Sequence, residues 1–101
     1  MVSRLELQSK LEELLGSKNV YYQPPASVKM KYPAIRYSKA GLRPDYANNS
    51  VYRKLTRYEI TVIDRTPDNP VIDMLMELPY CSYDRHYVAD NLNHDTLTLY
   101  Y

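Results

Sequence analysis

The run Val51–Thr66, VYRKLTRYEITVIDRT, constrains the fold of this chain more than any other segment. From Tyr58 onward apolar and polar residues alternate, which is the period of a β-strand with one buried and one solvated face. The alternation assigns two sets of side chains to opposite faces: Tyr58, Ile60 and Val62 to one, Arg57, Glu59 and Thr61 to the other. Because the run is long enough to extend beyond its sheet, we expect it to form an extended hairpin with the preceding strand.

An amphipathic helix is predicted at the start of the chain. Ser3-Arg4-Leu5-Glu6 has the pattern of a capping box, and Gly16 suits a left-handed helix end. These signals predict a helix over Arg4–Leu15 whose apolar stripe consists of Leu5, Leu11, Leu14 and Leu15.

A second helix is predicted in RTPDNPVIDMLMELP. Asp68 or Asn69 can cap its start, Pro70 suits its first turn, and Pro79 ends it. Its apolar stripe consists of Val71, Ile72, Leu75 and Leu78.

The remaining strands are predicted in NVYYQPP, Ala34–Lys39, Tyr80–Val88 and Thr96–Tyr101, with ADNLNHD as a turn. Ala40–Ser50 is rich in loop-forming residues, and a loop of this length is typical of a functional or mobile segment. The order of elements predicts an α+β fold: a mostly antiparallel sheet, an N-terminal helix, a second helix packed on the sheet, and a long β-hairpin or loop. At 101 residues, the whole chain 1–101 is expected to form a single domain.

The stretch LPYCSYDRHYVADNLNHD holds the only cysteine and both histidines, which are candidates for nucleophilic or metal chemistry. Strict alternation over Tyr80–Val88 places Cys81 and His86 on opposite faces, so they cannot form a nucleophilic pair within the strand. Asp84 and His86 share a face, and with His94 they could form a metal site, although the spacing matches no strong metal motif. We therefore favour a structural role for these residues.

Other catalytic and cofactor motifs are missing from the sequence. It has no GxxxxGK[ST] or GxGxxG segment and only two glycines, which argues against a nucleotide cofactor. No carboxylate pair or Ser/His/Asp constellation stands out. In the predicted strand Arg85 alternates with Tyr83 and Tyr87, as in a stacking platform for single-stranded nucleic acid, but nearby aspartates weaken that interpretation. We expect no enzymatic activity, no cofactor and no metal.

Charge is distributed unevenly along the chain. Residues 29–57 carry eight lysines and arginines against one aspartate, a net +7, whereas residues 58–101 carry two arginines against eight acids, a net −6. This asymmetry is typical of a nucleic-acid face, or of a positive segment that meets the negative segment of another copy, unless the fold interleaves the charges. The best candidates for contacts with a lumen or a neighbour are Arg43, Arg53, Lys54 and Arg57.

The remaining composition favours an interface protein in a reducing compartment. The chain has 12 Tyr but no Phe or Trp, and tyrosine suits half-buried strands and interfaces. A single cysteine cannot form an internal disulfide. The amphipathic N-terminus lacks the apolar region of a secretory signal, and no run approaches the roughly 18 apolar residues of a membrane span.

The chain as a whole resembles the tail-terminator, or tail-completion, proteins of long-tailed double-stranded DNA bacteriophages. The most specific parts of the resemblance are YPAIRY, YEITVIDRTPDNP and LPYCSYDRHYVADNLNH. It implies a structural virion protein that forms a ring, usually of six copies, on the end of the tail tube. The ring would stop tube polymerisation and form the joint to the head connector.

The resemblance also implies the partners: other copies of the chain, the tail tube protein, the head–tail connector or neck protein, and genomic DNA passing non-specifically through the lumen. Assembly would take place in the cytoplasm of the host bacterium, and the product would reside in the tail or neck of the virion. Two alternatives stay open, a head-closure or neck connector protein of the same particle and a small nucleic-acid-binding module.

Overall fold

A computed structural model describes the backbone of residues 4–25, 27–47 and 50–101, and the side chains of these residues except 42–47 and 50–55. The elements in this part of the chain are α1 (Arg4–Leu15), β1 (Val20–Tyr22), β2 (Ala34–Ala47), β3 (Ser50–Asp64), α2 (Val71–Met76), β4 (Cys81–Ala89) and β5 (Leu92–Tyr100). Neither of the helices in these ranges is long and apolar enough to cross a membrane.

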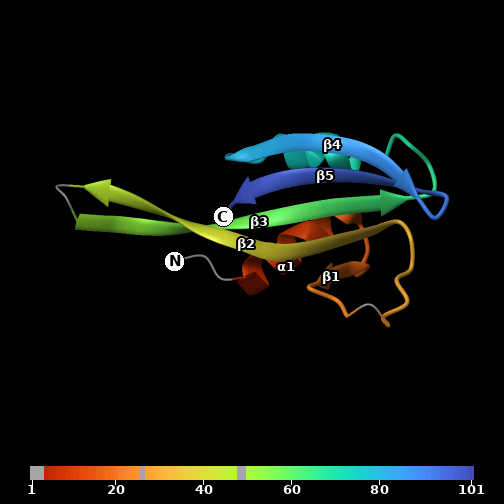
Figure 1. Ribbon diagram of the computed structural model, residues 1–101, viewed down its shortest axis with the longest axis horizontal. Helices are drawn as coiled ribbons and strands as arrows, with labels where there is room; N and C mark the ends of the chain where they lie inside the picture. The colour runs from red at the N-terminus through yellow and green to blue at the C-terminus, as the bar shows by residue number, and fades with distance from the viewer. Residues whose placement is uncertain (1–3, 26, 48–49) are drawn as a thin grey trace.

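The described strands form one sheet in the order β1-β2-β3-β5-β4 (Figure 1). β1 pairs parallel to β2, whereas the pairings of β2 with β3, β3 with β5 and β4 with β5 are antiparallel. The predicted α+β class is confirmed. The sheet is mixed rather than mostly antiparallel, because the chain returns from α1 to add β1 alongside β2 in the same direction.

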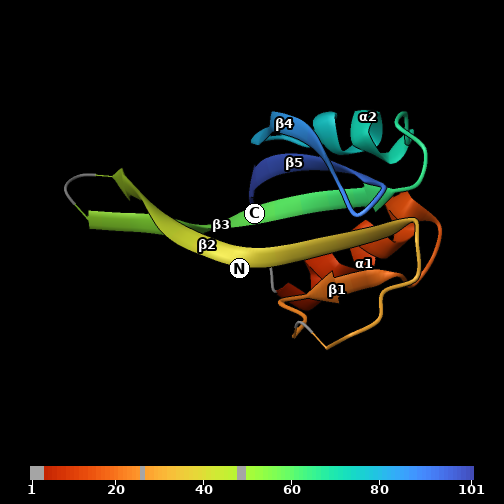
Figure 2. The same cartoon turned by 45° about the vertical axis from the view of Figure 1, so that its right-hand side comes forward.

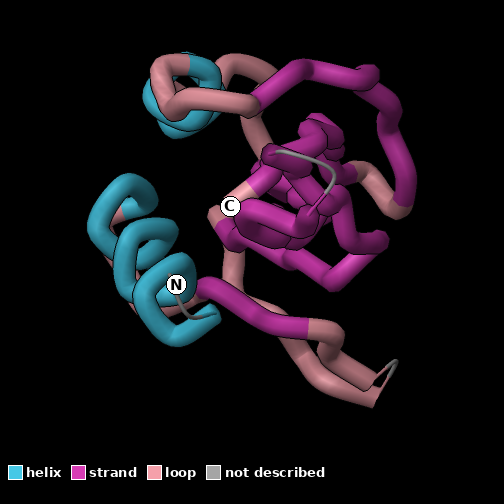
Figure 3. Tube along the Cα trace, turned by 90° about the vertical axis from the view of Figure 1, so that its left-hand side faces the viewer, coloured by secondary structure: helices cyan, strands magenta, loops and turns pink. Residues whose placement is uncertain are grey.

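Both helices lie on the same side of the sheet (Figure 3). Leu7 and Leu11 of α1 and Val71 and Leu75 of α2 are fully or almost fully buried there. They pack against the apolar faces of the central strands, whose buried residues are Ile35, Tyr37, Tyr58, Ile60, Val62, Leu97 and Leu99. Each such aliphatic side chain contributes about 1.5–3 kcal/mol when it is fully buried.

Tyr37 ties α1 to the sheet through a buried phenol. Its hydroxyl donates to Gln8 Oε1 and accepts from Arg4 at 3.2 Å, and Gln8 also donates to the backbone oxygen of Val20 at 3.0 Å. Burial raises the pKa of Tyr37, and the nearby Arg4 opposes the shift. The ring contacts Tyr22 and Tyr58 at centroid distances of 4.9 and 5.9 Å. A tyrosine suits this position because its apolar ring fills the core while its hydroxyl is satisfied.

The helices confirm most of the sequence signals. α1 spans the predicted Arg4–Leu15 and ends at Gly16, whose φ is +77°. The predicted stripe is wrong at Leu5, which is 66% exposed, because Leu7 rather than Leu5 lies one turn before Leu11. Asn69 supports the start of α2, since its side-chain oxygen accepts from the Val71 N–H at 2.9 Å. Ser3, the predicted capping residue of α1, lies outside the described residues.

Two predicted loops are largely strand. β2 continues to Ala47, so most of the expected loop Ala40–Ser50 is one side of the hairpin. β5 begins at Leu92, so only Asp90 and Asn91 of the expected turn connect it to β4. Both have positive φ, 53° and 62°, which matches a two-residue hairpin turn with both central residues left-handed. Asp and Asn tolerate this conformation better than most residues, which explains how so short a connection forms.

Replacing Leu11 with alanine tests the packing of α1 on the sheet. Leu11 is fully buried, so Leu11→Ala should lower the free energy of unfolding by about 2–5 kcal/mol. Leu5→Ala on the exposed side of the same helix is the matched control and should stay within about 0.5 kcal/mol. Urea denaturation measures both. Equal losses in the two variants would contradict the assigned helix face.

Candidate interaction surface

A β-bulge in β4 decides which residues of the histidine-containing stretch lie together. Tyr83 pairs with Leu97, but the next registered pair is Arg85 with Thr96, so Asp84 is an extra residue. Strict alternation therefore fails after Tyr83. The predicted faces of Arg85, His86 and Tyr87 are reversed relative to Cys81 and Tyr83.

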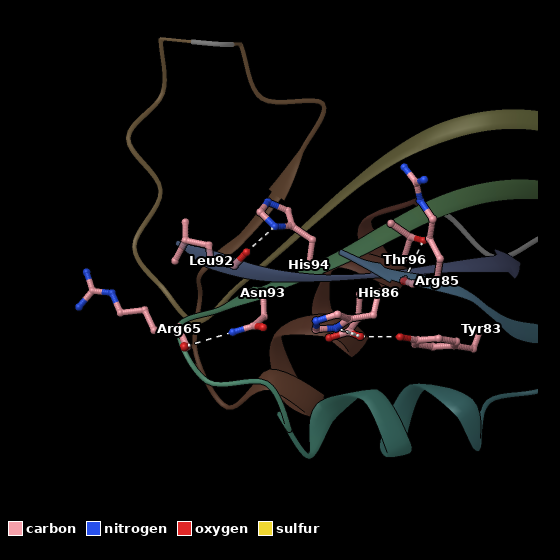
Figure 4. A network of polar contacts seen from close by, with 9 residues as sticks. Arg65, Tyr83, Arg85, His86, Leu92, Asn93, His94 and Thr96 are labelled. Carbon is pink, nitrogen blue, oxygen red and sulfur yellow. Dashed lines mark hydrogen bonds and ion pairs between the residues drawn. The ribbon is translucent and has the colours of Figure 1, made fainter. Parts of the chain in front are cut away.

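The bulge brings Tyr83 and His86 to the same side of the sheet, the side on which α2 lies (Figure 4). There they share one oxygen of Asp95, a carboxylate that is 6% exposed. The Tyr83 hydroxyl donates to Asp95 Oδ1 at 2.6 Å, and His86 Nδ1 lies 2.9 Å from the same atom. The bond to Asp95 and, to a smaller extent, burial raise the pKa of Tyr83 to about 12. This cluster satisfies a buried charge and joins β4 to β5.

The other members of the predicted metal site lie elsewhere. Asp84 is the bulge residue and accepts a hydrogen bond from the Thr98 hydroxyl at 2.8 Å. His94 is bound to the backbone oxygen of Leu92 at 3.0 Å and stacks on Tyr87. The described residues contain no group of three His, Cys, Asp or Glu that could hold a metal ion. The alternative in which Asp84, His86 and His94 form a metal site, which the sequence did not favour, is therefore not supported, because the bulge gives the three side chains separate partners.

Cys81 lacks the features of a nucleophile. It is half-buried and packs against the core cluster. Burial, with a smaller contribution from Asp84, raises the pKa of its thiol. An active nucleophile requires the opposite shift, because the thiolate is the reactive form. The structural reading of this cysteine is therefore the better supported one.

The face of the sheet opposite the helices is polar and hollowed. It forms a shallow groove of about 410 Å³ across β2, β3, β5 and β4, with arginines that come from three different strands: Arg36, Arg57 and Arg85. Thr61, Thr96 and Thr98 lie between them, with the carboxylates Glu59 and Asp84. A second hollow of about 520 Å³ shares Arg36, Glu59 and Thr61 and continues to Lys39. We call this surface the open-face groove.

Arg85 and Tyr87 in the groove stack with each other and, beneath Tyr87, with the buried His94. The Arg85 guanidinium lies 4.9 Å from the centre of the Tyr87 ring, and Tyr87 stacks on His94 with centroids 4.7 Å apart and planes 13° from parallel. The prediction that Arg85 and Tyr87 share a face is confirmed, but Tyr83 is not part of that face. Sequence reasoning missed Arg36 and the threonines as groove residues, although their polar positions in alternating strands were a usable signal.

The predicted basic contact residues fall on the β2–β3 hairpin. Arg57 lies in the open-face groove, where its guanidinium donates to the backbone oxygen of Ala40 at 2.9 Å. Arg43, Arg53 and Lys54 belong to the distal part of the hairpin, and their side chains lie outside the described residues.

A second charged surface lies on the helix side, along residues 64–77. This acidic segment carries Asp64, Asp68, Asp73 and Glu77 against Arg65, a net −3. Asp64 is bound locally, since it accepts from the Thr66 N–H and from the Asn69 amide. Asp68, Asp73 and Glu77 are exposed, and the exposed Met74 and Met76 lie beside them on α2. Acidic and apolar side chains therefore share one accessible surface.

Comparison with known protein families and with curated proteins gave no match to this chain.

Replacing Tyr83 with phenylalanine tests the Asp95 cluster. Near neutral pH, Tyr83→Phe should lower the free energy of unfolding by about 1 kcal/mol, below the usual value for a bond to a charged group because Tyr83 is 41% exposed. The pKa of tyrosine is about 10 in the unfolded chain and is higher in the folded protein. The Tyr83–Asp95 bond therefore contributes its full stability to the fold below about pH 10. The benefit of Tyr83 should then be lost as pH rises from about 10 to about 12.

Denaturation over this pH series, compared between wild type and variant, measures the effect. Tyr80→Phe is the matched control, because Tyr80 is exposed and no hydrogen bond of its hydroxyl is found among the described residues. If Tyr83→Phe and Tyr80→Phe follow the same curve, the Tyr83–Asp95 bond does not stabilise the fold.

Proposed function

We propose that this chain is a structural subunit of a ring that caps the tail tube of a long-tailed bacteriophage. The ring ends tube polymerisation and forms the joint to the head connector. The chain acts by binding and shape, without catalysis.

The observation that carries the proposal is the distal half of the β2–β3 hairpin, which we call the arm and which the structure describes over residues 42–47 and 50–55. β3 pairs with β5 only from Arg57 to Asp64, whereas β2 and β3 continue to pair with each other as far as Ala47 and Ser50. Within the described residues no other strand flanks the arm. It extends away from the helices and the other strands, and the longest dimension of the molecule is 50 Å against 24 and 22 Å (Figure 2).

A free two-stranded ribbon is costly to maintain by itself. A hairpin without further strands or a helix against it is marginally stable in water, because it buries too little surface to offset its ordering. An arm of this length is therefore best explained by a surface that covers it in an assembly. A neighbouring subunit in a ring provides such a surface, as does the tube or the connector.

The charge distribution supports a ring rather than a symmetric dimer. The arm carries Arg43, Arg53 and Lys54 against Asp45 in its sequence, a net +2, and the acidic segment 64–77 belongs to the other end of β3. Opposite charges at opposite ends favour head-to-tail contacts between identical copies. Such heterologous contacts close into rings when the rotation between copies allows it.

The partners follow from the proposal. One side of the ring would bind the tail tube protein and the other the connector or neck protein, and DNA would pass through the lumen. Phosphate attraction to basic residues is non-specific in sequence, so a basic lumen tolerates any genome. The protein would reside in the tail or neck of the virion.

Deleting the chain from its phage tests the proposal directly. Electron microscopy of the resulting particles should show overlong tails that are not attached to heads, because nothing stops tube growth. Tails of normal length beside heads that have lost their DNA would assign the chain to head closure instead. Normal, infectious particles would refute a role in the joint.

Removing basic charge from the hairpin, at three residues of the arm and at Arg57 beyond its base, tests the role of this charge in assembly. The quadruple change Arg43→Gln, Arg53→Gln, Lys54→Gln and Arg57→Gln should weaken ring formation or DNA retention and should lower the yield of infectious particles by roughly tenfold or more, because it removes the charge that attracts a neighbour or DNA phosphates. The matched control replaces Lys10, Lys18, Lys29 and Lys31 with Gln and removes the same charge outside the hairpin. Wild-type infectivity of the arm variant would contradict the prediction.

A further inference from the structure

The open-face groove has cations without internal partners. Among the described residues no carboxylate lies within ion-pair distance of the Arg36 or Arg85 guanidinium. Arg85 instead lies against the Tyr87 ring. Four cations and two carboxylates face the groove and its extension, a net +2: Arg36, Lys39, Arg57, Arg85, Glu59 and Asp84. Unpaired guanidiniums over a concave surface favour an acidic ligand with carboxylates or phosphates.

The acidic segment 64–77 is the complementary surface on the same chain. Its Asp68, Asp73 and Glu77 are exposed, and no ion pair of theirs is found within the described ranges. Exposed methionines beside them supply adaptable apolar contact, which isolated surface acids lack.

The two surfaces of one molecule cannot meet. The groove is lined by residues on the open face of the sheet. Both helices lie on the other side of the sheet (Figure 3), and Arg85 lies on the side away from α2 (Figure 4), so the sheet separates the groove from the acidic segment. The groove and the acidic segment can therefore contact each other only between molecules. Contact between two different faces of identical copies is heterologous, the kind of contact that builds rings.

We infer that the open-face groove of one copy binds the acidic segment 64–77 of the next copy, through Arg36 and Arg85 on one side and Asp73 and Glu77 on the other. The inference rests on the proposed ring and identifies the surfaces that join its subunits.

A protein segment fits the groove better than nucleic acid does. The groove is mixed in charge, because Glu59 and Asp84 lie among its cations. A phosphodiester backbone is uniformly negative and would be repelled by these carboxylates. The acidic segment is also mixed, since Arg65 accompanies its acids and could meet Glu59 or Asp84. Complementary arrangements of positive and negative charges on two surfaces attract the surfaces and also fix how they align.

Charge reversal on each surface tests the inference. The groove variant combines Arg36→Glu with Arg85→Glu, and the segment variant combines Asp73→Lys with Glu77→Lys. Each variant alone should sediment as a monomer in analytical ultracentrifugation, since like charges then meet. An equimolar mixture of the two should recover the oligomer of the wild type when the variants alternate. The reversed groove of one variant then meets the reversed segment of the other, and the two unaltered surfaces meet each other.

The control variant Lys10→Glu with Lys18→Glu changes the net charge as much as the groove variant and should associate like the wild type. Recovery in the mixture also shows that both variants are folded. A wild type that stays monomeric at every attainable concentration overturns the inference, as does a groove or segment variant that still associates. Loss of salt-dependent binding to a duplex DNA fragment in the groove variant, with association unchanged, would assign the groove to nucleic acid instead.

These outcomes are separable from those of the phage deletion. If the reversed pair restores association but the deleted phage builds normal tails, the contact is correct and the tail-capping function is wrong. If tails become overlong while both variants associate like the wild type, the function is supported and this contact is wrong.

Discussion

The one-sided alternation of β3 is the constraint on which the rest of the structure depends. Because Tyr58, Ile60 and Val62 all point to one face, most of the buried apolar side chains of the sheet lie on that side, and both described helices pack there. Hydrophobic burial is thereby concentrated in one layer. The opposite face keeps its threonines and charged side chains, so it remains available as a polar surface rather than a second core.

The same strand also limits how much of the molecule can stabilise itself. Its C-terminal half lies between β2 and β5, and its N-terminal half pairs only with β2 within the described chain. A domain of this size buries only a modest core. An arm that no other surface covers costs conformational entropy to order and buries little apolar surface in return. An assembly in which another surface covers the arm would add the missing burial and offset this ordering cost. The polar groove and the acidic segment, on opposite faces of the sheet, are suited to the same head-to-tail arrangement.

Prediction from sequence succeeded where one face of an element is apolar. The face of β3 and the end of α1 at Gly16 are confirmed, because a period of two leaves one consistent register for the strand and a left-handed glycine ends the helix. β4 is polar on both faces around Asp84, so no hydrophobic pattern specifies where its side chains point. The bulge there places His86 beside Tyr83 and Asp95, and Asp84, His86 and His94 therefore do not form a metal site. Leu5 failed for a related reason, since several leucines offer more than one stripe.

The sequence by itself determined the α+β class, the central amphipathic strand, the first helix and the uneven distribution of charge, because these follow from local periodicity and composition. Only the tertiary structure decided the parallel addition of β1, the bulge at Asp84, the Asp95 cluster and the gathering of Arg36, Arg57 and Arg85 on one face. These features join residues from strands far apart in the chain. Cross-strand register sets them, and register is an outcome of packing the whole sheet under its helices rather than of any one segment.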